Sequence, residues 1–64
     1  MYGEHIEEMY KLFKENGEKN VDNNTLAIAV AENVCDQGLE KADTDEQFDE
    51  LVAKIRAQVD YMRG

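Results

Sequence analysis

Apolar residues recur with the period of an α-helix in three segments, and a glycine follows each of the first two. The three segments span about residues 4–16, 23–37 and 45–63. Gly17 and Gly38 stand where a left-handed residue would close a helix, and Leu39 can then fold back onto Val34 in a Schellman motif. The sequence therefore predicts an all-α fold, a small three-helix bundle forming one acidic helical domain over residues 1–64.

The width of each apolar stripe predicts where its helix lies. On a helical wheel the first stripe covers about 80°. It holds Tyr2, Ile6, Met9, Tyr10 and Phe13. The third covers about 100°. It holds Phe48, Leu51, Val52, Ile55, Val59 and Met62. The second covers about 200°. It holds Leu26, Ala27, Ile28, Val30, Ala31, Val34 and Cys35. An arc that wide favours contacts on two sides, so the second helix is predicted to be central.

Capping residues mark where the second and third helices begin. Asp22 is a favourable N-cap, and Val21 and Leu26 then occupy the two positions of a hydrophobic staple. Thr44 and Gln47 have the spacing of a capping box. Connections of roughly six residues favour antiparallel neighbours. A chain of about 60 residues buries only about 60% of its unfolded surface, so completion of the core by dimerisation stays open.

Negative charge is concentrated in residues 32–50, which we call the acidic segment. The chain carries a net charge of −8. Eight acids against Lys41 alone give this segment −7, which leaves −1 for all other residues. The eight acids are Glu32, Asp36, Glu40, Asp43, Asp45, Glu46, Asp49 and Glu50. Acids at the start of the third helix stabilise it, but Glu32 and Asp36 approach the unfavourable end of the second. Such charge more often serves only to keep a small protein soluble, and the alternative is that it forms a docking surface.

Two apolar residues fall outside the stripes. Leu12 lies off the first stripe, and Tyr61 lies about 140° off the third. Both are predicted to be exposed, and they are the apolar candidates for a partner contact. The alternative is that they are isolated surface residues, which are common.

Few residues offer catalytic or metal-binding chemistry. The chain has one cysteine, Cys35, and one histidine, His5, which are too few for an internal disulfide or a zinc site. A calcium loop beginning at Asp43 would place Phe48 where glycine is needed and Lys54 where glutamate is needed. The chain has no serine, which excludes a phosphopantetheine carrier. We therefore expect no enzyme activity and no cofactor or metal.

The acidic charge also limits the kinds of partner that the protein can bind. Nucleic acid and anionic membranes repel such a chain, and no apolar run approaches the ~18 residues of a membrane span. The start lacks the basic and apolar regions of a secretory leader, and a single cysteine fits a cytoplasmic location. We expect an interaction module, an inhibitor or adaptor that docks on a basic protein. A nucleic-acid-binding protein is one candidate, which the module would bind by mimicking nucleic acid. The alternative is a structural or accessory subunit that forms a homodimer through helix packing.

Overall fold

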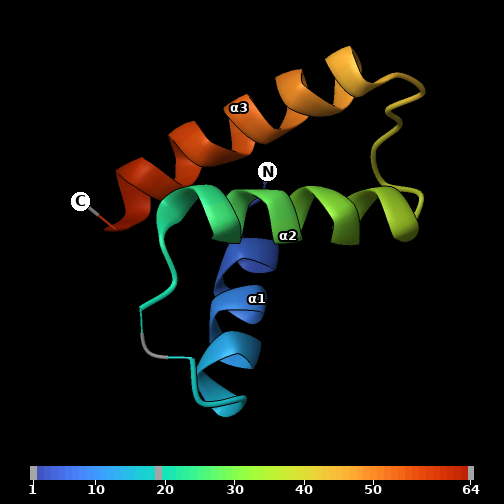
Figure 1. The fold of residues 1–64 in the computed structure, drawn as a ribbon. Helices are drawn as coiled ribbons and strands as arrows, with labels where there is room; N and C mark the ends of the chain where they lie inside the picture. The colour runs from blue at the N-terminus through green and yellow to red at the C-terminus, as the bar shows by residue number, and fades with distance from the viewer. Residues whose placement is uncertain (1, 19, 64) are drawn as a thin grey trace.

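Three helices and two connections make up the computed structural model, which describes residues 2–18 and 20–63. The helices are α1 (Gly3–Glu15), α2 (Asn23–Asp36) and α3 (Asp45–Arg63) (Figure 1). No strand occurs among these described residues. The fold is therefore the small all-α bundle that the sequence predicts, and each helix end lies within one residue of its expected position.

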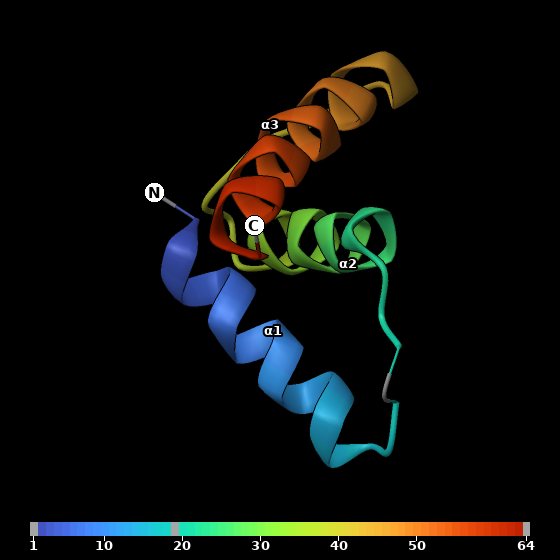
Figure 2. The ribbon, with the colours of Figure 1, turned by 90° about the vertical axis from the view of Figure 1, so that its left-hand side faces the viewer.

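The second helix lies at the centre of the bundle, as its wide apolar arc predicts. α1 packs on one side of α2 and α3 on another (Figures 1 and 2). The expectation of antiparallel neighbours is wrong for α1, which crosses α2 steeply in both views. Ile6 is the only residue of α1 that is fully buried. A single deeply buried side chain near one end does not require α1 to lie along α2.

The core is entirely apolar. Its buried members are Ile6, Val21, Leu26, Ala27, Val30, Ala31, Val34, Leu51, Ile55 and Val59. No polar or charged side chain is buried in the described part of the chain. Met62, predicted to lie on the α3 stripe, is 39% exposed. Met62 is therefore not buried as the sequence predicts. In the last turn of α3 it is Arg63 that contacts the rest of the fold.

Local side-chain and backbone bonds fix the helix ends. The Asp22 carboxylate accepts a hydrogen bond from the Thr25 backbone N–H at 2.7 Å. Interactions with the Thr25 side chain and with this backbone N–H hold the pKa of the Asp22 carboxyl below its usual value. The hydroxyl oxygen of Thr44 accepts from the Gln47 N–H at 3.1 Å. The Gln47 side chain in turn accepts from the Asp43 N–H at 2.8 Å, one residue before the cap. These bonds confirm the predicted N-caps of α2 and α3.

A Schellman motif ends α2. Gly38 has φ 75°, a left-handed conformation that suits glycine. Its N–H donates to the Cys35 carbonyl at 3.0 Å, and the Leu39 N–H donates to the Val34 carbonyl at 2.9 Å. The chain therefore turns back sharply after α2, as the sequence predicts, although the Leu39 side chain stays 58% exposed.

Arg63 joins the end of α3 to the rest of the bundle. Its Nη1 donates to the Val21 carbonyl at 2.7 Å and to Asn23 Oδ1 at 2.9 Å. The guanidinium carbon lies 5.1 Å from the centroid of the Tyr10 ring in α1. Asn23 also donates through Nδ2 to Asp60 at 2.6 Å. The last turn of α3 thus contacts α1, the connection between α1 and α2, and the start of α2.

Candidate docking surface

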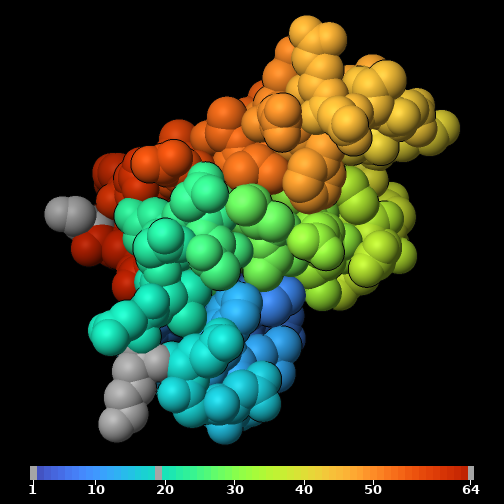
Figure 3. Space-filling view, in the orientation of Figure 1, coloured from blue at the N-terminus to red at the C-terminus, as the bar shows by residue number. Residues whose placement is uncertain are grey.

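The acidic segment forms one end of the molecule. It comprises the last turns of α2, the connection that follows and the first turns of α3, at the right-hand end in Figures 1 and 3. All eight acidic residues named for this segment are exposed. α2 and α3 diverge toward this end in Figures 1 and 2, as like charges favour. Exposed charges remain hydrated, and their field extends about 10 Å at 0.1 M salt.

Helix electrostatics account for only part of this charge. Asp45 and Glu46 occupy the first turn of α3, where the helix dipole favours acids. The last turn of α2 contains no basic residue, and Asp36 is its final residue. Negative charge there is unfavourable for the helix. The acidic segment therefore includes charges that local helix stability does not require.

Glu40 differs from the other acids because its side chain is held in place. Its Oε1 accepts a hydrogen bond from the Tyr2 hydroxyl at 2.6 Å. This bond, together with burial and the Glu40 charge, raises the pKa of Tyr2 to about 12. The bond joins the start of α1 to the connection that follows α2. The bond links residues 38 positions apart, so no local pattern in the sequence predicts it.

The apolar candidates lie away from the acidic segment. Leu12 is 50% exposed and Tyr61 is 84% exposed, which confirms their predicted exposure. Tyr61 is in the last turn of α3, about 18 Å along the helix axis from Asp49. The structure therefore does not place Tyr61 on one surface with the acids, and Leu12 lies in α1, outside the elements that form the acidic segment. Leu39 is the exposed leucine adjacent to Glu40 in the chain, and the sequence predicts for it only a place in the Schellman motif.

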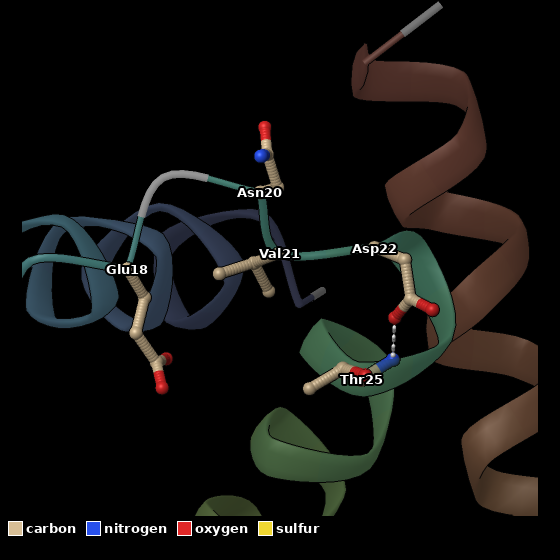
Figure 4. A pocket seen from close by; sticks show the side chains of 5 residues that line it. All are labelled: Glu18, Asn20, Val21, Asp22 and Thr25. Atoms are coloured by element: carbon tan, nitrogen blue, oxygen red, sulfur yellow. Dashed lines mark hydrogen bonds between the residues drawn. The ribbon is translucent and has the colours of Figure 1, made fainter.

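Shallow cavities indent the surface. One of about 380 Å³ lies at the connection between α1 and α2, lined by Glu18, Asn20, Val21, Asp22 and Thr25 (Figure 4). The side chains of Glu18 and Asn20 point in different directions, and Asp22 is engaged by the Thr25 N–H. These groups do not converge on a common point where a ligand or metal would sit.

A smaller cavity of about 230 Å³ lies beside the acidic segment. Its lining residues are Tyr2, His5, Val34, Leu39 and Glu40. It therefore combines two aromatic side chains and two aliphatic ones with the hydrogen-bonded carboxylate. Across residues 2–18 and 20–63, no three histidine, cysteine or acidic side chains are grouped to hold a metal ion. Over the same ranges, none of the helices has both the length and the apolar character to cross a membrane.

No protein-family model matches this sequence, and neither a curated protein nor a solved structure is significantly similar to it. The class that the fold and this surface define is a small all-α bundle with an acidic end. Its function is inferred from its own charge, exposure and contacts.

Proposed function

We propose that this protein is a non-catalytic interaction module whose acidic segment docks on a basic surface of another protein, as an inhibitor or adaptor. The observation that carries the proposal is the placement of the charge. The acidic segment carries −7 of the chain's net charge of −8, and its eight acids are exposed at one end of the fold. The position of Asp36 at the unfavourable end of α2 supports selection for something other than helix stability.

Complementary charge would act mainly on the rate and specificity of association. A cluster of carboxylates attracts a basic surface over about one Debye length and repels acidic competitors. Proteins that bind nucleic acid carry basic surfaces for phosphates. Carboxylates on Glu32 and Asp36, about 6 Å apart along the helix axis, can occupy such a surface in place of phosphates. The favoured partner is therefore a nucleic-acid-binding protein, which the module would block in the cytoplasm.

A pair of charge-matched variants tests this proposal. The first neutralises four acids of the acidic segment: Glu32→Gln, Asp36→Asn, Asp45→Asn and Asp49→Asn. The second neutralises four exposed acids of α1: Glu4→Gln, Glu7→Gln, Glu8→Gln and Glu15→Gln. Each variant changes the net charge from −8 to −4. Circular dichroism first verifies that both variants keep the helicity of the native protein.

Each variant and the native protein are then used to purify partners from host lysate at low salt, with elution by a salt gradient. We expect the native protein and the α1 variant to retain the same basic protein, and duplex DNA to displace it. The acidic-segment variant should lose this partner. Equal retention by all three proteins, or equal loss from both variants, would show that the location of the charge does not matter and would refute the proposal.

Self-association through helix packing is the second candidate. The exposed apolar side chains of Leu12, Leu39, Tyr61 and Met62 support it. The charge of −8 on every copy opposes it. Sedimentation at micromolar concentration distinguishes the two: a homodimer supports the structural-subunit function, and a folded monomer excludes it.

A further inference from the structure

The cavity beside Glu40 has the size and lining of a site for one side chain. Its volume of about 230 Å³ is below the ~300–1,000 Å³ typical of small-molecule sites. Val34 and Leu39 contribute aliphatic surface, Tyr2 and His5 contribute aromatic rings, and Glu40 contributes the carboxylate. An occupant that matches this lining has an apolar stem and a positively charged end.

Hydrogen bonds fix the cavity wall before any partner binds. The Leu39 and Glu40 N–H groups both donate to the Val34 carbonyl, at 2.9 and 3.3 Å. The Glu40 carboxylate receives the Tyr2 hydroxyl on Oε1, and Oε2 makes no hydrogen bond within the described part of the chain. No other described carboxylate of the acidic segment accepts a hydrogen bond from a side chain. A preformed wall and a fixed acceptor lower the ordering cost of binding.

We propose that this cavity receives an arginine side chain of the basic partner, an inference that rests on the function proposed above. Charge complementarity is its basis: the acidic segment carries −7, and its one fixed carboxylate borders the cavity. A guanidinium stacks on aromatic faces and is more weakly hydrated than an ammonium, so the rings of Tyr2 and His5 favour arginine over lysine. The arginine stem packs on Leu39, and its N–H groups donate to Glu40 Oε2.

Binding of a fluorescein-labelled oligo-arginine peptide to the intact protein tests the inference, with fluorescence anisotropy at low ionic strength as the readout. Glu40→Gln keeps one oxygen that can accept from the Tyr2 hydroxyl, but it removes the charge and replaces the proposed second acceptor, Oε2, with an NH2 group. We expect it to weaken binding about tenfold, as for loss of a charged hydrogen bond worth about 1.4 kcal/mol. Glu50→Gln, which makes the same charge change in the acidic segment away from the cavity, should weaken binding about twofold.

Two leucine variants test the apolar wall separately. Leu39→Ala should weaken binding about threefold, because the arginine stem loses contact area. Leu12→Ala is its matched control, since Leu12 is 50% exposed and Leu39 58% exposed, and it should leave this affinity unchanged. Nuclear magnetic resonance locates the peptide independently: the amide signals of Tyr2, Leu39 and Glu40 should shift more than those of the other acidic residues. An oligolysine peptide of equal length should bind more weakly.

The outcomes separate this inference from the proposed function. If the peptide binds but Glu40→Gln and Glu50→Gln weaken its binding equally, the cavity is not the site. Docking by the acidic segment then still stands. If the oligolysine peptide binds as tightly as oligo-arginine, the assignment to arginine is overturned. If neither peptide binds the native protein, both the cavity site and the proposed function fail.

Discussion

Replacing Arg63 with methionine should destabilise the whole bundle, although the residue is exposed at the last turn of α3. Methionine retains an apolar stem but loses both hydrogen bonds and the contact with the Tyr10 ring. The part-buried bond from the charged guanidinium to the Val21 carbonyl contributes about 1.5 kcal/mol. The exposed bond to Asn23 and the Tyr10 contact add about 0.5 kcal/mol together.

The expected loss of about 2 kcal/mol is a large part of the stability of so small a protein. Domains of this length have unfolding free energies of about 3–10 kcal/mol in total. Arg63→Met should therefore lower the thermal midpoint by about 8–16 °C. In urea, with a slope near 1 kcal/mol per molar, it should lower the unfolding midpoint by about 2 M. Far-ultraviolet circular dichroism measures both transitions.

Arg56→Met provides the matched control. Arg56 is also exposed on α3, and no hydrogen bond from its side chain is found among the described residues. Both variants change the net charge from −8 to −9, so a general charge effect should be the same in each. We expect Arg56→Met to cost less than about 0.5 kcal/mol. If the two variants lose equal stability, the Arg63 contacts do not hold the bundle together.

Two further perturbations address the Tyr2–Glu40 bond and the core. Because the pKa of Tyr2 is raised from 10.0 to about 12 in the folded protein, the stabilisation from its protonated hydroxyl should be complete below pH 10 and lost as the pH rises through 12. Urea unfolding should therefore show an advantage of the native protein over Tyr2→Phe that disappears across this range; a constant difference would contradict the assignment. Ile55 is 0% exposed, and Ile55→Ala should cost about 3 kcal/mol in the same assay. A loss below about 1 kcal/mol would show that the core there is not closely packed.

Much of the secondary structure could be predicted because its signals are local. Asp22, Thr44 and Gly38 each act within a few residues, through bonds that the chain makes to its own nearby backbone. The apolar periods likewise identified the buried faces of α2 and α3. Local chemistry of this kind does not depend on how the helices are arranged.

Contacts between distant residues were not predictable in the same way. Arg63 and Val21 are 42 positions apart, and Tyr2 and Glu40 are 38 positions apart. Such pairs meet only once the crossing of the helices is set, and periodicity does not specify that crossing. The acidic segment could be found by counting charges, but the fixed position of Glu40 beside a cavity could not.

The single deeply buried residue of α1 implies a hierarchy of local stability. α2 and α3 together supply eight of the ten buried core residues, whereas α1 supplies only Ile6. The free energy needed to open an element falls with the apolar contact that it makes. α1 should therefore detach in partial unfolding events that leave the α2–α3 pair intact, with faster amide hydrogen exchange than its neighbours. Since Tyr2 restrains this helix through Glu40, occupancy at the acidic end and the free energy of opening α1 are thermodynamically linked.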